Sequence, residues 1–434
     1  MTSRPGASYH GSTMPKASFL ALFSPAAGTA PRRRKVPLTQ PLRHARYRRI
    51  WLANLVSNLG TWIQTFAAAW LVASLSQSAS ITSLVQTATY VPVFLFALLA
   101  GVLADAVHRP KFLFFCNLFN AVCAGAMALL VWRGNVSSGP VLVITFCLGI
   151  GTAFIWPAWQ AALSSLVEPD EVEAAATLNN LSYNLSAILG PALGGLLFGW
   201  IGPGALFLAN AVSFIGLLAV YWHWWREGAP QPAAREGFGA RLRLGFATAF
   251  GCPRYRRILG NVCSVFFATI AFASLLPVFV RDVLHMRAGM YGTLMGCLGG
   301  GAVAAAFFLP QVRARVDRTG LLAGALLVYG AMLLIMPHTR SLALLAPLIV
   351  CGGMAWSTTV STLNAAAQLS FPAEVRARTL SIYLFVMSGG YAAGSVVWGL
   401  VADAWGVRAA FAAAGACVVL NALVLLTGGK KHPI

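Results

Sequence analysis

The chain has 434 residues, of which 58% are hydrophobic and only 10% are charged. A soluble domain carries about 25% charged residues, so this composition excludes an ordinary soluble protein. From Ile50 to Ala104 the sequence contains no Asp, Glu, Lys or Arg, which leaves room for two membrane helices of about 20 residues each. The chain is therefore predicted to be an integral membrane protein.

Twelve apolar segments follow one another along the chain, separated by short polar or charged stretches. Because every backbone polar group in lipid needs a hydrogen-bond partner, these segments are expected to be α-helices. The predicted fold class is an all-α membrane protein with twelve transmembrane helices. The segments run 51–75, 81–104, 112–132, 141–166, 175–201, 205–222, 258–280, 290–309, 321–336, 342–369, 379–402 and 409–426.

The net charge of +20 raises the alternative of nucleic-acid binding, which its distribution disfavours. If both termini are cytoplasmic, all but five of the 31 Lys and Arg residues fall on the cytoplasmic side, as the positive-inside rule requires. Topology and anionic lipid explain the charge better than nucleic acid does. We expect a monomeric, multi-pass protein of the bacterial inner membrane, with both termini cytoplasmic and membrane lipid as a partner. The five exceptions are Arg133, Arg281, Arg287, Arg340 and Arg408.

The pentapeptide RYRRI occurs twice, at Arg46–Ile50 and at Arg254–Ile258, before the first and seventh segments. In both copies we expect the arginines to reach lipid phosphates and the tyrosine to lie at the membrane interface. Further matches lie 204 residues apart and indicate a tandem duplication, as in transporters built from parallel repeats. These pairs are Gly190 with Gly394, Gly195 with Gly399, Gly202 with Gly406, and Phe207 with Phe411.

The duplication divides the chain into four predicted parts. Residues 1–41 form a disordered basic cytoplasmic tail, and residues 42–225 form the first six-helix bundle. Residues 226–253 are rich in Gly, Ala, Pro and Arg, as a cytoplasmic linker would be. Residues 254–434 form the second six-helix bundle with a short tail.

The stretch GVLADAVHRPK, which follows the second segment, resembles the loop 2–3 signature of the major facilitator superfamily. Ala106 and His108 depart from that signature. The resemblance covers residues 42–426 and implies two parallel six-helix bundles around a central cavity. Asp105 ends its own helix, where the macrodipole disfavours an anion, so it is expected to latch onto the start of segment 379–402. The alternative is a simple cap with Arg109. The predicted gate comprises Gly101, Asp105, Arg109, Lys111, Arg376 and Arg378.

The motif GPALGG in segment 175–201 resembles the fifth-helix motif of antiporters in this superfamily. Its small residues allow another helix to approach closely, and the glycines at 292–301 offer a matching face. Packing alone explains the motif, while export is what the resemblance adds. The predicted packing residues are Gly190, Pro191, Gly194 and Gly195.

In this superfamily the first and fourth helices of each half face the cavity, and in this chain they carry amides and aromatic rings. Such groups suit an amphipathic ligand, although contacts between helices are an equal alternative for any one residue. The fifth segment adds three polar residues at helical spacing. The predicted substrate-binding residues are Asn58, Trp62, Gln64, Trp156, Gln160, Trp356, Asn364 and Gln368, together with Asn180, Tyr183 and Asn184 of the fifth segment.

All eleven acidic residues lie outside the centres of the segments, where a proton-coupled carrier would keep an ionisable group. Asp105, Asp282 and Asp403 are the remaining candidates to carry a proton. The absence of a central carboxylate also argues against a strongly cationic substrate. Since the sequence contains no nucleotide-binding loop and no metal-ligand cluster, we expect neither an enzyme nor a cofactor or metal.

The stretch NLVSNLGTWIQTFAAAWLV, taken with the two motifs, resembles the branch of the superfamily that contains the enterobactin exporter and macrolide efflux proteins. The resemblance implies a secondary active exporter of small amphipathic molecules, of siderophore or drug type, coupled to protons. A facilitator or importer of a small metabolite without proton coupling is the first alternative. A membrane sensor or lipid-handling protein is the second.

Overall fold

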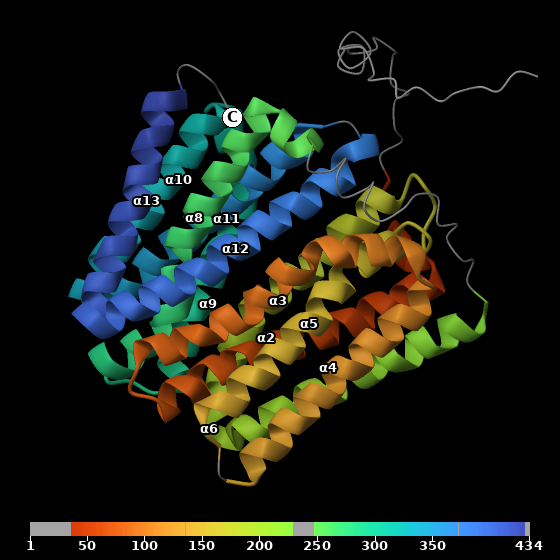
Figure 1. The fold of residues 1–434 in the computed structure, drawn as a ribbon, viewed down its shortest axis with the longest axis horizontal. Helices are drawn as coiled ribbons and strands as arrows, with labels where there is room; N and C mark the ends of the chain where they lie inside the picture. The colour runs from red at the N-terminus through yellow and green to blue at the C-terminus, as the bar shows by residue number, and fades with distance from the viewer. Residues whose placement is uncertain (1–35, 135, 229–246, 372, 430–434) are drawn as a thin grey trace, which may run out of the picture.

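The computed structural model describes residues 36–134, 136–228, 247–371 and 373–429, without the side chains of 102, 104–106 and 373–378. Within these residues all regular structure is helical, and the helices form two groups that lie side by side (Figure 1). Most of the predicted tail and most of the linker lie outside the described residues, but Gln40 and Pro41, predicted to belong to the disordered tail, begin a 3-10 helix. The fold agrees with the prediction of an all-α membrane protein.

The first half follows a short 3-10 helix, η1 (Gln40–Arg43). It contains α2 (Ala45–Leu75), α3 (Ala79–Ala106), α4 (Arg109–Trp132), α5 (Ser138–Leu163) and the 55-residue α6 (Val172–Arg226). Helix α6 is broken at Gly202, whose φ of 75° suits a residue without a Cβ. Tyr47 bonds the start of α6 and Arg46 pairs with Glu227 just after its end, so both ends of α6 lie at one end of the molecule. The break therefore separates the fifth and sixth predicted segments.

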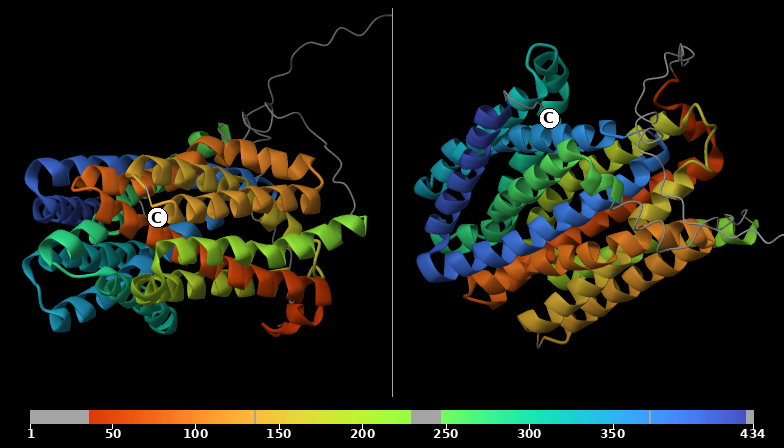
Figure 2. Two further views of the ribbon diagram at one scale, coloured as in Figure 1. Left: turned by 90° about the horizontal axis from the view of Figure 1, so that it is seen from below. Right: turned by 45° about the horizontal axis from the view of Figure 1, so that its top comes forward.

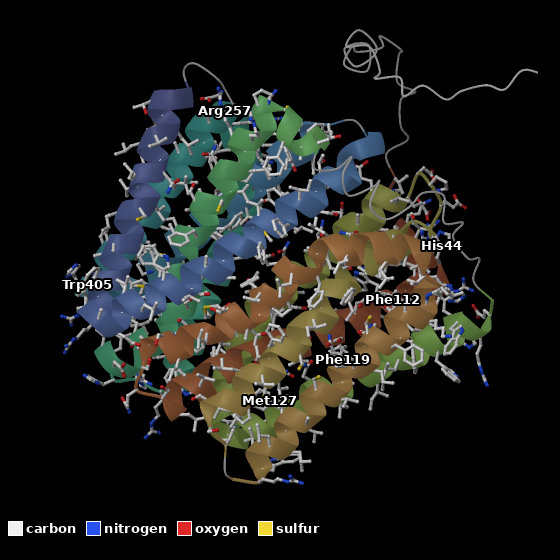
Figure 3. The ribbon with its side chains drawn as sticks, in the orientation of Figure 1. His44, Phe112, Phe119, Met127, Arg257 and Trp405 are labelled. Carbon is white, nitrogen blue, oxygen red and sulfur yellow. The ribbon has the colours of Figure 1, made fainter. Side chains whose placement is uncertain are left out.

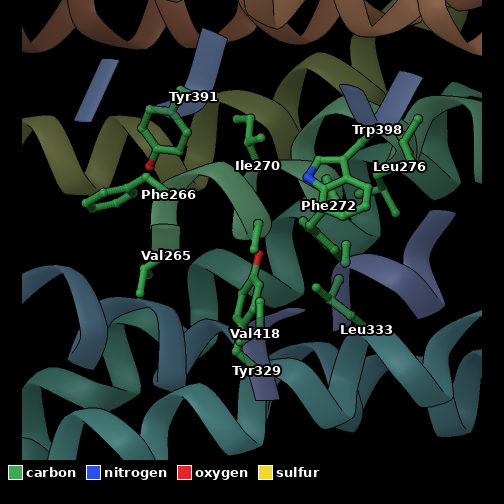
Figure 4. Packing of buried hydrophobic residues seen from close by; sticks show 14 of the residues in the cluster. Val265, Phe266, Ile270, Phe272, Leu276, Tyr329, Leu333, Tyr391, Trp398 and Val418 are labelled. Atoms are coloured by element: carbon green, nitrogen blue, oxygen red, sulfur yellow. The ribbon is translucent and has the colours of Figure 1, made fainter. Parts of the chain in front are cut away.

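The second half begins with α8 (Pro253–Val278), which continues as one π-helical turn, η2 (Phe279–Val283). It goes on with α9 (Ala288–Arg313), α10 (Arg318–Ile335), the short η3 (Met336–His338), α11 (Leu342–Leu369), α12 (Ala373–Trp405) and α13 (Val407–Gly429). Its interior is filled by large side chains from α8, α10, α12 and α13, among them Phe266, Tyr329 and Tyr391 (Figure 4).

Ten helices among the described residues are long and apolar enough to cross a membrane. The two parts of α6 count once in that number, and α2 is not included because Asn54, Asn58 and Gln64 lower its hydropathy. The finding confirms an integral membrane protein. Twelve crossings remain a prediction.

The two tyrosines of the repeated pentapeptide are buried inside the protein, so they do not contact lipid as a membrane-interface anchor would. Tyr47 and Tyr255 are both fully buried. Tyr47 donates to the carbonyl oxygen of Ala175 at 2.9 Å, and Tyr255 donates to that of Thr379 at 2.7 Å. Each hydroxyl thus ties the first helix of its half to the helix that follows the fourth segment. A buried ring needs such a partner for its hydroxyl, and both copies of the pentapeptide make the same contact.

The halves meet along two pairs of helices, α3 with α12 and α6 with α9. We call the end of the molecule that carries Arg226 and Pro253 the linker end, and the opposite end the far end. In Figure 3, His44 and Arg257 mark the linker end, and Trp405 marks the far end. Figure 2 shows the same two groups of helices in other orientations.

The first helix of each half is covered on all sides only toward the far end. Residues 66–73 of α2 and residues 274–280 of α8 and η2 are all buried. Toward the linker end the same helices carry exposed residues, among them Val56 and Cys263. At the far end Tyr291 of α9 stacks on Phe66 of α2, with ring centroids 4.5 Å apart. The halves are therefore in close contact around α2 and α8 at the far end.

Substituting Tyr255 with Phe should lower the stability of the protein by about 1 kcal/mol. The change removes the hydroxyl that bonds Thr379 and leaves a buried carbonyl oxygen without that donor. The apparent melting temperature of the purified protein in detergent measures the effect. Arg256→Gln, at an exposed neighbouring position, is the control and should leave the melting temperature unchanged. An unchanged melting temperature for Tyr255→Phe would contradict a structural role for this hydroxyl.

Candidate functional site

Three aromatic side chains from three helices converge in the first half, and we call Trp62 of α2, Trp156 of α5 and Tyr183 of α6 the aromatic trio. The Tyr183 ring stands edge-on to Trp62 at 5.7 Å and to Trp156 at 6.0 Å, measured between ring centroids. Large rings inside a helix bundle are usually buried. Here Tyr183 remains 40% exposed and Trp156 36% exposed, so the trio offers a partly open aromatic surface.

Amide side chains accompany the trio on the same helices. Asn180 lies three residues before Tyr183, and Gln160 lies four residues after Trp156, spacings that place these two amides near the rings. Asn184 lies four residues after Asn180, on the same face of α6 as Asn180. All three amides are exposed, and Asn58 on α2 is half-buried. The first half thus combines aromatic faces with hydrogen-bonding groups, which can hold a ligand that is part apolar and part polar.

Gln64 differs from the other predicted residues of α2 because its amide is used inside the first half. Its side chain is only 4% exposed, and its Oε1 accepts a hydrogen bond from Nδ2 of Asn210 at 2.6 Å. Asn210 lies in the second part of α6. This contact joins two helices, so in this conformation Gln64 holds the bundle together.

Trp356, predicted for the second half of the site, lies against buried rings of its own half. Phe266, Tyr329 and Tyr391 surround it with centroids 5.6, 5.9 and 6.4 Å away, and these three rings are at most 8% exposed. Farther along α11, Gln368 is exposed and donates to Asn364 at 2.9 Å. The second half therefore presents amides near the linker end of α11, and its aromatic residues form a packed cluster.

Arg313, at the linker end of α9, was not selected from the sequence. It is exposed, and its Nη2 donates to the hydroxyl of Ser361 on α11 at 3.0 Å. Ser361 precedes Asn364 by one helical turn, so the guanidinium reaches the polar face of α11. The sequence does not reveal this contact, because the partner of Arg313 depends on how α9 packs against α11.

The predicted gate at the linker end is described only in part. A Cβ at Gly101 would lie 3.3 Å from the Ser381 hydroxyl, so α3 and α12 approach closely there. Lys111 lies with its ammonium 5.3 Å from the centre of the Trp225 ring, a cation–π contact within the first half. The side chains of Asp105, Arg376 and Arg378 lie outside the described residues, and the latch stays a prediction.

The glycines of the GPALGG motif face two different helices. A Cβ at Gly190 would overlap Trp62, and one at Gly194 would lie 2.8 Å from the Phe66 ring. A Cβ at Gly195 would lie 2.7 Å from the Cα of Gly292 on α9. Backbone atoms cannot yield to such an overlap. The motif therefore packs α6 onto α2 within the first half and onto α9 across the halves.

Glu171 is a buried carboxylate just before α6, near the linker end. It is 3% exposed, and Nε2 of His44 lies 2.6 Å from its Oε2. Burial alone would raise the pKa of this carboxyl, but hydrogen bonds from His44 and Gln40 hold the pKa below its usual value. Glu171 is therefore ionised at neutral pH and ties η1 to α6. Among the residues that the structure describes, no group of three His, Cys, Asp or Glu could hold a metal ion.

A family model described as transmembrane secretion effector matches residues 37–429. The chain belongs to this family. A multidrug efflux pump, Tap, of Mycobacterium tuberculosis is 23% identical over 389 residues, which span 87% of this chain and 92% of the pump. The staphyloferrin A transporter of Staphylococcus aureus is 21% identical over 377 residues, 86% of this chain and 94% of that protein.

Solved structures of transporters share the fold. A bacterial homologue of the human lysosomal transporter Spinster, inward-facing and occupied, superimposes with a TM-score of 0.68 at 16% identity, covering 90% of this chain and 97% of that one. The nucleoside transporter NupG gives 0.69 at 10% identity, covering 89% and 99%. These findings confirm the predicted membership of the major facilitator superfamily and the predicted fold class. The chain is a membrane transporter, and no enzyme activity is implied.

Replacing Gly195 with Ala should lower the apparent melting temperature by several degrees. The new Cβ would press on the backbone of Gly292, and overpacking of this kind costs about 1–3 kcal/mol. Gly199 provides a matched control on the same helix, because nothing lies within 4 Å of a Cβ there. Gly199→Ala should be neutral or stabilising, since Ala suits a helix better than Gly by about 1 kcal/mol. Equal melting temperatures for the two variants would argue against a tight contact between α6 and α9.

Proposed function

We propose that this transporter exports small amphipathic molecules across the bacterial inner membrane by alternating access, binding them at the aromatic trio. The observation that carries the proposal is the partial exposure of Trp156 and Tyr183 among amides of the first half. The relatives that export drugs and transport a siderophore favour cargo of this size and character. Rings provide apolar contact, and the amides fix polar groups of the cargo.

The exposure of α2 and α8 is what alternating access requires, because only one end of the interface between the halves is open at a time. Both helices are covered at the far end and exposed toward the linker end. The linker end carries the predicted cytoplasmic segments, which hold all but five of the 31 Lys and Arg residues. The positive-inside rule therefore assigns this end to the cytoplasm. A protein in this state would accept cargo from the cytoplasm and, after the halves rock, release it on the other side.

The charge of the site favours neutral or anionic cargo. None of the acidic residues lies on the same helical turns as the trio, so these turns supply no carboxylate to neutralise a cation. Arg313 supplies a positive charge beside the polar face of α11. This charge at the linker end would attract anionic compounds that approach from that side.

Proton coupling belongs to the proposal because secondary exporters need an ion gradient to work against a concentration difference. Asp105, Asp282 and Asp403 remain the candidate carriers, and Asp282 is paired with Arg281. The lack of an acidic residue in mid-span favours the alternative of a facilitator or importer without proton coupling. A pH-sensitive dye inside vesicles separates the two, since substrate flux without proton movement would favour the facilitator.

Replacing both Trp156 and Tyr183 with Ala should weaken substrate binding at least tenfold, because both aromatic contacts are removed. A panel of siderophores and macrolides is first screened against the wild type, and the dissociation constant of a compound that binds is then measured by calorimetry. Trp200→Ala, at a ring that is 78% exposed at the far end, is the matched control. Unchanged affinity in the double variant would place the site elsewhere.

Substituting Arg313 with Gln should reduce transport of anionic compounds and leave neutral ones unaffected. The change keeps a hydrogen-bond donor near Ser361 but removes the positive charge. Initial rates for an anionic siderophore and a neutral compound are compared in the same vesicles, with Arg313→Lys as the charge-retaining control. An equal loss of transport rate for both compounds would indicate a structural role for Arg313. An unchanged rate for both would show that Arg313 does not act on the cargo.

A further inference from the structure

The short turn between α2 and α3 at the far end is held from both sides by the second half. Arg281 of η2 donates to the carbonyl oxygens of Ala73 and Ser76, where α2 ends. Asp403 of α12 accepts from the residues that begin α3. One cation and one anion of the second half thus bind the two helix ends that flank a single turn of the first half.

Asp403 makes three hydrogen bonds to the start of α3. Its Oδ1 accepts from the backbone nitrogen of Ala79 at 2.6 Å. Its Oδ2 accepts from the Ser78 hydroxyl at 2.7 Å and from the backbone nitrogen of Ser80 at 3.2 Å. The first amides of a helix have no partner inside the helix, and its dipole attracts an anion. Asp403 satisfies both needs from another bundle.

Arg281 makes the complementary contact at the end of α2. The last carbonyl oxygens of a helix are unpaired, and the negative end of the dipole attracts a cation. The guanidinium is oriented by its neighbour Asp282, whose Oδ2 accepts from Nη2 at 2.7 Å. Each charge therefore faces the helix end of opposite polarity, and exchanging the two would make both contacts unfavourable.

We propose that Arg281 and Asp403 form a clamp that holds the far end shut while the linker end is open, and that both contacts break when the far end opens. The proposal rests on the proposed alternating-access function. The partners belong to different halves, so any rocking that separates the halves at the far end must break these bonds. These hydrogen bonds are separate from the packing of one helix against another. They can act as a second gate, besides the predicted gate near Asp105.

The duplication shows that the clamp is specific to one of the two interfaces between the halves. Gly195 and Gly399 match at an offset of 204, and each packs near the start of a helix of the other half, Gly195 on Gly292 and Gly399 on Ser83. The same offset matches Asp403 with Gly199, which has nothing within 4 Å of a Cβ. The α6–α9 pair therefore lacks the carboxylate that the α3–α12 pair carries.

The α3–α12 pair also carries one sequence pattern at both ends. Residues 101–106 and 399–404 both read Gly-x-x-Ala-Asp-Ala. In the second, Gly399 allows close approach to α3 and Asp403 binds its first turn. In the first, Gly101 lies close to Ser381 of α12, and the sequence predicts that Asp105 reaches the start of that helix. One helix pair thus carries an aspartate for each end of the molecule.

The test measures opening of the far end directly, without a substrate. The eight cysteines are first replaced by serine, and spin labels are attached at Arg133→Cys and Arg340→Cys. Double electron–electron resonance in lipid nanodiscs then measures the separation of the halves at the far end. A second pair, at Glu168→Cys and Arg315→Cys, reports the linker end. Asp403→Asn and Arg281→Gln are each compared with the labelled parent. Arg408→Gln, an exposed charge at the start of α13, is the control.

Both clamp variants should increase the population with a long far-end distance at least threefold and reduce the population that is open at the linker end. The control should match the parent. Unchanged distances in both variants would overturn the clamp. The two substitutions act on different helix ends, so failure of one variant to fold leaves the other to decide. Because the distances require no cargo, a protein that moved no compound in vesicles would refute the proposed function without affecting this result.

Discussion

The close approach of small residues between the two halves is the constraint on which the rest of the structure depends. Gly195 meets Gly292 backbone to backbone, and Gly399 lies against the first turns of α3. In lipid, where apolar side chains gain little by leaving their solvent, such packing is what joins helices. It brings the far-end turn within reach of Arg281 and Asp403.

The two halves, whose sequences indicate a duplication, differ in how their aromatic residues are packed. The first half keeps its aromatic trio partly exposed among amides, whereas the matching region of the second half packs Trp356 against Phe266, Tyr329 and Tyr391. The first half is thus suited to bind cargo. The second half provides the charges that hold the far-end turn. Such a division would let one bundle retain the ligand while the other controls access to it.

The sequence predicted the membrane class, the duplication and the family, because hydropathy and repeats are local patterns that survive without knowledge of packing. It did not predict that Tyr47 would be buried, since an aromatic residue near a membrane surface satisfies either environment. It also missed the contacts of Arg313 and of Arg281. Those depend on how helices far apart in the chain dock, and neither periodicity nor spacing specifies that. Gln64 shows the same limit, because its partner Asn210 lies 146 residues away.

The measurement that tests the account most directly is uptake into membrane vesicles of known orientation. Inverted vesicles, which expose the cytoplasmic face, are prepared beside right-side-out vesicles from the same cells, and both are given a proton gradient and a panel of siderophores and macrolides. The account predicts accumulation of at least one compound in inverted vesicles only, and its loss when the gradient is collapsed. Accumulation confined to right-side-out vesicles would contradict export and would make the protein an importer.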